Sequence, residues 1–324
     1  MRLALVTRPL TDDKLHLAAQ IGVTDIVADC PGPDPAGFDA LHARISAVGL
    51  RLSVIENCLP LIRPVLGQPG RDEDIEEIAN IIRNMGRLQI PVLCYNFMPS
   101  GDWNRTSVTM PERGGALVSA FDEAEIEAAA SLLANGTIRD NEEAEHERVP
   151  AAQLWENLEY FLERLLPVAE QEGVALAMHP DDPPMSSFRG YEQIMTSPDA
   201  FDRLLGLSSS PANGICYCQG SFGSMGIDVV ANIRRFADAI KYVHFRDVRG
   251  SVPKFQETFH DNGPTDMAAA IRTYVELGFD GPIRPDHVPV LHGESTDWAG
   301  YTMLGRLHAI GYMQGLIEAA RAAT

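Results

Sequence analysis

The feature that most constrains the fold is an alternation, repeated eight times, between short apolar segments and longer segments with helical spacing. The apolar segments are nearly continuous, as in strands that a parallel sheet buries on both faces. They lie at residues 2–7, 23–28, 51–56, 90–95, 173–178, 214–218, 240–245 and 281–286. The helical segments lie at residues 12–21, 36–48, 72–86, 153–172, 198–206, 226–237, 265–277 and 303–322. Eight strands that alternate with eight helices predict a (β/α)8 TIM barrel.

An open, doubly wound sheet is the alternative that gives the same alternation. The glycine-rich phosphate loop of a nucleotide-binding first turn is missing from this chain. A chain of 324 residues could hold two ordinary domains, but (β/α)8 barrels reach this size as one domain. We therefore expect a single barrel domain over residues 1–324.

One long segment departs from the alternation, between the fourth strand and its helix. It covers residues 97–150 and contains a helical piece near 122–134 and an acidic segment near 140–147. Loops of this length inside a compact domain are usually lids or binding loops. We expect an active-site insertion or lid at 97–150.

The composition indicates which binding partners are excluded and in which cellular compartment the protein resides. The net charge of −19 argues against nucleic acid and anionic membranes, because both attract positive surfaces. No apolar run reaches transmembrane length, and the first residues are too short a run for a signal peptide. Five cysteines are an odd count in a chain of this size, which favours reduced thiols. We expect a cytoplasmic protein that binds a small molecule and assembles as a homo-oligomer, a dimer.

Polar residues stand at the ends of four consecutive predicted strands, where the chemistry of such barrels takes place. They are His179, Cys218, His244 and Asp286. A lone histidine at a strand end is more often hydrogen-bonded than a metal ligand, but four coordinating groups on one rim indicate a metal site. The mixed nitrogen, sulfur and oxygen donors favour Mn²⁺, Zn²⁺, Fe²⁺ or Co²⁺ over Mg²⁺ or Ca²⁺.

The alternation of side chains along a strand predicts where the neighbours of Cys218 and Asp286 point. Cys216 is expected to point away from Cys218 and to belong to the core. Asp286 and His287 are adjacent, and a turn at the strand end could bring both to the rim, one for the metal and one for proton transfer. The alternative is that Asp286 pairs with Arg284 and that His287 caps a helix.

Two further segments are candidates for binding a ligand, one rich in glycine and one that contains an aromatic residue. The segment 219–223, QGSFG, could offer backbone N–H groups to a carboxylate or phosphate, although a tight turn is the simpler interpretation. Trp103 and Arg105 in the insertion could close over a polyol and its carboxylate, and ordinary loop packing is the alternative.

Several motifs resemble those of the mannonate dehydratase family of carbohydrate metabolism, which belongs to the xylose-isomerase-like barrels. They keep the order and spacing of that family over roughly residues 80–310. The motifs are CYNFMP (94–99), DWNRT (102–106), HPDDPP (179–184), CQGS (218–221), HFR (244–246), FQETFH (255–260), RPDH (284–287) and GYTMLGRL (300–307).

The resemblance implies roles for individual residues. It assigns a divalent ion, usually Mn²⁺, to His179, Cys218, His244 and Asp286. It assigns proton transfer to His287 and Tyr301, without deciding which is the base and which the acid. The candidate substrate-binding residues are Asn96, Trp103, Arg105, Arg246, His260 and Arg284.

The resemblance implies a lyase that removes water from D-mannonate, or a related sugar acid, to give a 2-keto-3-deoxy acid, 2-dehydro-3-deoxy-D-gluconate. A metal-dependent sugar isomerase or epimerase on the same barrel is one alternative, and a sugar-acid-binding barrel without catalysis is another. The chain departs from the family pattern at Gln219, at Val288 and over residues 56–60. Because strands one and three help to line the pocket, we expect such departures to affect the choice of substrate.

Overall fold

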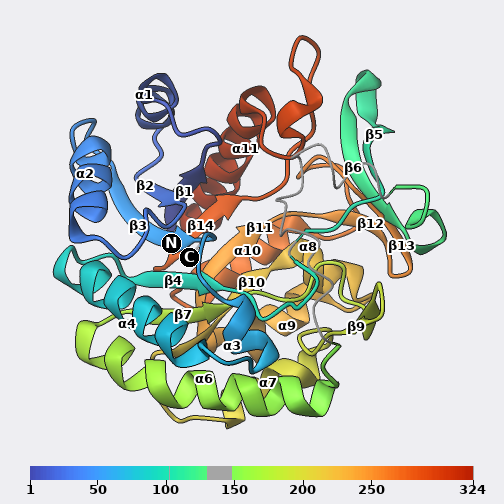
Figure 1. The fold of residues 1–324 in the computed structure, drawn as a ribbon. Helices are drawn as coiled ribbons and strands as arrows, with labels where there is room; N and C mark the ends of the chain where they lie inside the picture. Colours follow the sequence, from blue (N-terminus) through green and yellow to red (C-terminus); the bar gives the residue numbers. More distant parts are fainter. Residues whose placement is uncertain (102, 130–147, 324) are drawn as a thin grey trace.

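Eight parallel strands close into a barrel. The structure is a computed structural model that describes residues 1–101, 103–129 and 148–323. The strands follow one another around the barrel in the order β1-β14-β11-β10-β7-β4-β3-β2 (Figure 1). They are β1 (Arg2–Val6), β2 (Asp25–Ala28), β3 (Arg51–Glu56), β4 (Val92–Tyr95), β7 (Ala175–Met178), β10 (Asn213–Cys218), β11 (Ile240–Phe245) and β14 (Pro282–Pro285). Because β1 pairs with both β2 and β14, the sheet is closed, and the predicted (β/α)8 barrel is confirmed.

Helices surround the barrel at each predicted position (Figure 1). They are α1 (Asp12–Gln20), α2 (Pro35–Ser46), α4 (Arg71–Arg87), α6 (Ala151–Glu172), α7 (Pro198–Gly206), α9 (Val229–Arg235), α10 (Met267–Glu276) and α11 (Met303–Ala322). Side chains of Thr11, Asp34 and Ser197 accept hydrogen bonds from the first-turn N–H groups of their helices, which explains where α1, α2 and α7 begin. In the part of the chain that the structure describes, no helix is long and apolar enough to cross a membrane.

Shorter elements complete the chain. The short helices are α3 (Ile62–Leu66), α8 (Gln219–Ser224), η1 (Arg113–Gly115), η2 (Glu123–Glu125), η3 (Ala237–Ala239) and η4 (Thr296–Trp298), and a small hairpin joins β8 (Ser187–Phe188) to β9 (Tyr191–Glu192). The segment that the sequence allowed to be a tight turn is therefore the helix α8.

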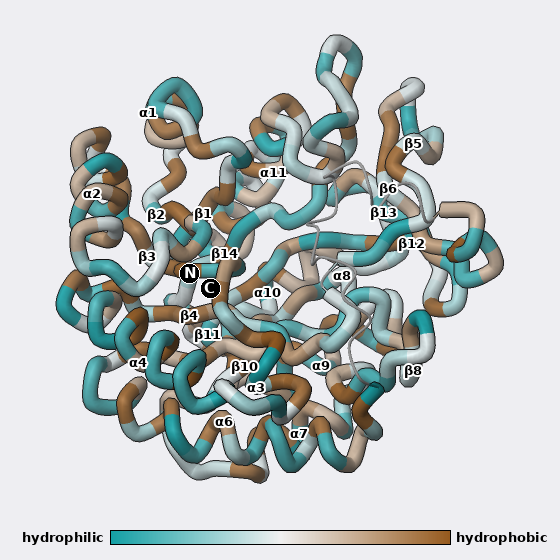
Figure 2. The backbone as a smooth tube through the Cα atoms, in the orientation of Figure 1, coloured by the Kyte–Doolittle hydropathy of each residue, from teal (hydrophilic) through white to brown (hydrophobic). Residues whose placement is uncertain are grey.

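The core has an outer layer between strands and helices and an inner layer inside the barrel. Hydrophobic residues are frequent along the barrel strands and alternate with hydrophilic ones along the helices (Figure 2). The inner layer contains Ala4, Val6, Val27, Val54, Val92, Cys94, Ala177, Cys216 and Tyr242. Tyr217 belongs to the outer layer, and its hydroxyl donates to the Val229 carbonyl oxygen at 2.7 Å.

The orientation of Cys216 corrects a prediction. Cys216 was expected to point away from Cys218, but residues two positions apart on a strand lie on the same face. Both thiols point into the barrel, and Tyr217 between them points outward. The assignment of Cys216 to the core was correct, since its side chain is fully buried.

A second sheet of four antiparallel strands lies beside the barrel, in the order β12-β13-β6-β5 (Figure 1). It combines β5 (Ser107–Pro111) and β6 (Leu117–Asp122) of the insertion with β12 (Val248–Ser251) and β13 (Lys254–Glu257), which follow β11. In place of the helix expected from residue 122, the chain forms η2 and a turn up to residue 129. Residues 130–134 and the acidic segment 140–147 lie outside the described residues. The lid and single-domain assignments stay predictions.

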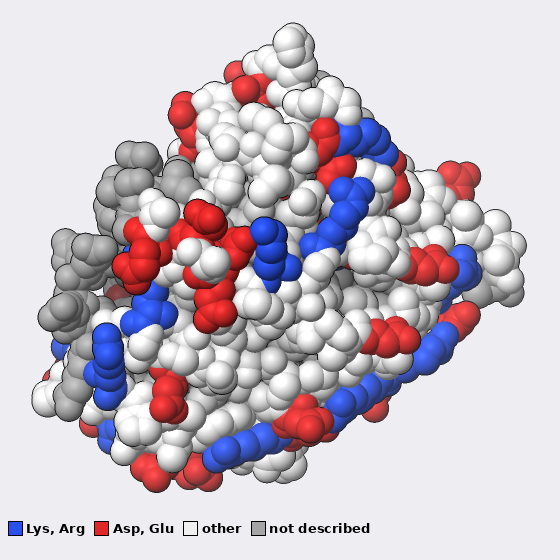
Figure 3. All heavy atoms as spheres, turned by 90° about the vertical axis from the view of Figure 1, so that its right-hand side faces the viewer, with Lys and Arg blue, Asp and Glu red and all other residues white. Residues whose placement is uncertain are grey.

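The face that carries this sheet has a mixed charge. Acidic and basic side chains are interspersed on it (Figure 3). Arg113 pairs with Asp261 at 2.9 Å, and Lys254 with Asp122 at 2.7 Å. The acids on this face therefore lie beside bases rather than forming one large field of a single sign.

Candidate active site and metal centre

A cavity of about 660 Å³ opens at the carboxyl ends of the barrel strands. Its wall includes three non-glycine residues in the left-handed backbone region, Asn57 (φ 70°), Cys58 (φ 57°) and Trp103 (φ 52°). Such conformations cost of order 1–3 kcal/mol each and are kept only where the surroundings enforce them. Their gathering on one wall marks the cavity as a candidate functional site.

Three of the four predicted metal ligands lie close together at the carboxyl ends of their strands, and two of these, His179 and His244, line the cavity. His179 follows β7, Cys218 is the last residue of β10, and His244 lies on the neighbouring strand β11. One potential ligand atom of each lies within 4.8 Å of those of the other two. Asp286, the residue after β14, completes the predicted set, since its Oδ2 is 3.7 Å from Cys218 Sγ and 3.8 Å from His244 Nδ1. Parallel strands of a barrel end at one rim, and this is why residues so distant in sequence meet.

The hydrogen bonding of the two imidazoles fits a metal centre. His179 Nδ1 lies 2.6 Å from the carbonyl oxygen of Pro180, which leaves the lone pair of Nε2 for another partner. His244 Nε2 is buried and has only one close polar neighbour among the described residues, Glu56 Oε1 at the long distance of 3.5 Å. Buried ring nitrogens are normally satisfied, so this atom needs an explanation, and a bound cation supplies one.

The charges of the group fit a divalent ion. Burial would raise the pKa of Asp286, but the guanidinium groups of Arg284 and Arg246 hold it well below its usual range, so Asp286 is a carboxylate. A carboxylate and a Cys218 thiolate together balance two positive charges. Arg284 donates to Asp286 Oδ1 at 2.6 Å, so the predicted alternative of an Asp286–Arg284 pair is also present, on the oxygen that faces away from Cys218.

The predicted proton-transfer residues lie side by side. His287 Nε2 is 3.5 Å from the hydroxyl oxygen of Tyr301, and the Trp103 ring packs at 4.5 Å from the imidazole. Burial lowers the pKa of His287 to about 4 and raises that of Tyr301. The pair is therefore a neutral imidazole and a neutral phenol. His287 contacts these side chains and caps no helix.

A buried network of charges lies behind His287. Arg105 donates to both oxygens of Asp182 at 2.7 and 2.9 Å and to Glu257 at 2.7 Å. Arg246 donates to Asp182 at 3.0 Å. Glu257 Oε1 lies 3.0 Å from His287 Nδ1 and so faces the proton-transfer pair directly. Strand-end reasoning missed Glu257, although it lies inside the FQETFH motif, which could have indicated it.

The predicted substrate-binding residues separate into two groups. Asn96, Trp103 and Arg284 line the cavity. Arg105, Arg246 and His260 are buried outside its lining, and their described contacts are with protein groups. His260 stacks on Phe245 with ring centroids 5.9 Å apart, and burial lowers its pKa to about 4. Contact of these three with a substrate stays a prediction.

A closed (β/α)8 barrel with a polar cavity at the carboxyl ends of its strands is the arrangement of TIM-barrel enzymes. Among solved structures, a xylose isomerase domain protein from Planctomyces limnophilus has a TM-score of 0.62 at 14% identity, over 99% of this chain and 98% of the other, which shows the shared fold. The model of the D-mannonate dehydratase family matches residues 14–324. The chain belongs to the mannonate dehydratase family.

Individual relatives agree with this assignment. The mannonate dehydratase of Streptococcus equi subsp. zooepidemicus is 38% identical, over 86% of this chain and 81% of that protein. That of Oceanobacillus iheyensis is 35% identical, over 87% and 84%. The crystal structure of the mannonate dehydratase from Streptococcus suis serotype 2 has a TM-score of 0.86 and 33% identity, and the match covers 100% of this chain and 95% of that chain. The predicted family and the enzyme class, a hydro-lyase, are confirmed.

Proposed function

We propose that this chain is a divalent-metal-dependent dehydratase that converts D-mannonate into 2-dehydro-3-deoxy-D-gluconate. The observation that carries the proposal is that one cavity is lined both by His179, His244 and Asp286, which could ligate a metal, and by the pair His287–Tyr301. Membership of the family supports the substrate. The mixed donors suit Mn²⁺, Zn²⁺, Fe²⁺ or Co²⁺ rather than Mg²⁺ or Ca²⁺, and the family resemblance favours Mn²⁺.

The residues that would hold the ion are His179, Cys218, His244 and Asp286. The hydrogen on the carbon next to a carboxylate is very weakly acidic. Negative charge collects on the carboxylate oxygens as this hydrogen leaves as a proton. A divalent ion in this group would stabilise that charge. With its thiol proton displaced by the ion, Cys218 would together with the Asp286 carboxylate balance the two positive charges of such an ion.

The chain's own residues would move the protons. One member of the His287–Tyr301 pair takes the proton from the carbon, and the other gives a proton to the departing hydroxyl group. Glu257 and Arg246 both lie on the Nδ1 side of His287, at 3.0 and 2.8 Å, so the Nε2 side is the one directed at Tyr301 and the cavity. Trp103, packed on the imidazole, excludes water from this side of the pair.

A substrate panel tests the function. The purified protein with added Mn²⁺ is assayed against D-mannonate and a set of other aldonic and uronic acids, with detection of the 2-keto-3-deoxy product. We expect the highest kcat/KM for D-mannonate. Interconversion of a keto sugar without loss of water would establish the isomerase alternative, and binding without turnover would establish the non-catalytic one. The cytoplasmic location and the dimer stay predictions.

A further inference from the structure

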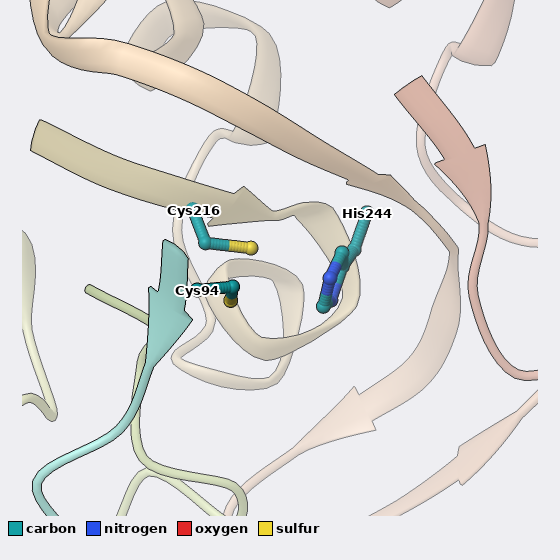
Figure 4. Close-up of side chains that lie close together, drawn as sticks. All are labelled: Cys94, Cys216 and His244. Atoms are coloured by element: carbon teal, nitrogen blue, oxygen red, sulfur yellow. The ribbon is translucent and has the colours of Figure 1, made fainter. Parts of the chain in front are cut away.

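A second group of potential metal ligands lies inside the barrel. It consists of Cys94 on β4, Cys216 on β10 and His244 on β11, all of them buried. One ligand atom of each lies within 4.8 Å of those of the others, and the three side chains project into the same interior space (Figure 4). The group shares His244 with the proposed reaction site but contains neither Cys218 nor Asp286.

The two thiols are placed for an ion rather than for a disulfide. Strand β7 lies between β4 and β10, and Cys94 is in register with Ala177 on it. Neighbouring strands are about 4.8 Å apart, so two spacings separate the two backbones by roughly 9 Å. A disulfide requires Cα atoms within about 7 Å. Ala177 is in turn in register with Gly214 on β10, so Cys216 lies two residues further along that strand on the same face. An ion bound between the two thiols adds the length that a disulfide lacks.

The chemistry of the group selects soft ions. Thiolates prefer Zn²⁺, Cd²⁺ or Cu⁺, whereas Mn²⁺ prefers oxygen ligands. Two thiolates and a neutral imidazole form an uncharged complex with a divalent ion, which suits the surrounding layer of valine and alanine side chains. An ion that binds the two sulfur atoms displaces the protons of both thiols.

The cavity gives an ion access to this group. Cys94 and His244 both line it, so an ion that enters the reaction site reaches their ligand atoms from the same side. A neutral imidazole has one lone pair for a metal. We call His179, Cys218, His244 and Asp286 the upper group, and Cys94, Cys216 and His244 the lower group. His244 can therefore hold an ion in one of these groups or in the other, but not in both at once.

We propose that Cys94, Cys216 and His244 form a second metal site, for a thiophilic divalent ion such as Zn²⁺ or Cd²⁺, and that an ion bound there inhibits the enzyme by withdrawing His244 from the reaction site. Binding at this site stands on the geometry alone. Inhibition rests on the proposed function.

Cadmium is the probe for binding. Cd²⁺ is titrated into the metal-free protein, and thiolate-to-cadmium charge-transfer absorption is recorded for the unmodified chain, Cys216→Ala, Cys94→Ala and Cys218→Ala. Cys58→Ala, at an exposed thiol that lines the cavity but belongs to neither group of ligands, is the matched control. We expect most of the absorption to disappear in Cys216→Ala and Cys94→Ala and to persist in Cys58→Ala. Loss in Cys218→Ala with no change in Cys216→Ala would place the ion only in the upper group and overturn the proposal.

X-ray absorption at the cadmium edge is measured on the unmodified chain, so its result does not depend on whether a variant folds. At one equivalent of Cd²⁺, two sulfur neighbours support the second site, and one sulfur neighbour contradicts it.

Activity tests the inhibition. With saturating Mn²⁺, we expect Cd²⁺ to inhibit Cys216→Ala at least tenfold more weakly than the unmodified enzyme, each compared with its own uninhibited rate. Equal inhibition of the unmodified enzyme and of Cys216→Ala would refute the proposal that an ion at the second site inhibits the enzyme. If the substrate panel shows no dehydration at all, the absorption titration still decides whether the site exists, so the two failures are distinguishable.

Discussion

His287 Nε2 and the hydroxyl oxygen of Tyr301 lie 3.5 Å apart, and the Trp103 ring closes one side of this pair. Gly300 stands between them in the chain with a left-handed φ of 78°, and a Cβ there would lie 3.3 Å from Trp103 and 3.4 Å from His287. The glycine thus permits the close approach that brings a residue from the end of the barrel and one from the following loop into contact.

Replacing either member of the pair should abolish most of the turnover and leave the metal in place. We expect His287→Gln and Tyr301→Phe each to lower kcat by about 10²–10⁴-fold, because each removes one proton transfer. Mn²⁺ affinity, measured by electron paramagnetic resonance, should stay within a few-fold. His16→Gln, at an exposed histidine on α1, is the control and should keep full activity.

Exchange in deuterium oxide assigns the base. The variant that retains the base but lacks the acid should still exchange the substrate hydrogen on the carbon next to the carboxylate. The variant that lacks the base should not exchange it. Full activity in His287→Gln would contradict a proton-transfer role for this residue.

Glu257 is predicted to position His287 and to stabilise the buried charges around it. Glu257→Gln leaves the guanidinium groups of Arg105 and Arg246 without one of their carboxylates, and removal of one partner from a buried ion pair costs about 3–5 kcal/mol. We expect a loss of that size in urea unfolding and a lower kcat with little change in KM. Glu125→Gln, at an exposed carboxylate, is the matched control. Equal stability of the two variants would show that the network does not depend on Glu257.

The barrel and the upper metal group could be predicted from the sequence because both depend on local patterns. Apolar runs such as residues 240–245 are recognisable as buried strands, and in a parallel barrel every strand end lies at one rim. Once the strand ends were known, the convergence of His179, Cys218, His244 and Asp286 followed from topology. The resemblance alone indicated Tyr301, which lies in a loop.

The small sheet could not be predicted in this way. Gln256 on β13 pairs with Ala120 on β6, and such long-range antiparallel pairing leaves only a weak local pattern. The buried network of Arg105, Asp182 and Glu257 depends on this pairing, since Glu257 is the last residue of β13. The lower cysteine group was missed for a different reason, namely that Cys216 was assigned to the wrong face of its strand.

Removal of metal should inactivate the enzyme reversibly. We expect EDTA treatment to abolish dehydration and Mn²⁺ to restore it. Because an ion that binds only the folded state stabilises it, Mn²⁺ at about 100 times its Kd should raise the free energy of unfolding by about 2.7 kcal/mol. Cys218→Ala should lose this increment, whereas Cys58→Ala should keep it. The same increment in both variants would exclude Cys218 as a ligand.

Asp181 should make the protein less stable as the pH rises. Burial raises the pKa of its carboxyl from 3.8 to about 7; Oδ2 accepts from the Met195 N–H at 2.7 Å, and Oδ1 has no hydrogen-bond partner among the described residues. Between about pH 4 and pH 7 the folded state therefore binds more protons at this group than the unfolded state, so the free energy of unfolding falls through this window.

Asp181→Asn keeps an acceptor for Met195 and cannot ionise, so it should remove this part of the pH dependence. At about 1.4 kcal/mol per pKa unit, the variant should gain up to about 4 kcal/mol relative to the unmodified chain at pH 8, with little difference at pH 4. Urea unfolding at both pH values, in EDTA so that no metal adds charge, measures the difference. Asp280→Asn, at an exposed carboxylate, should not show it. A stability difference between the Asp181→Asn and unmodified chains that does not change with pH would mean that the pKa of Asp181 is the same in the folded and unfolded states.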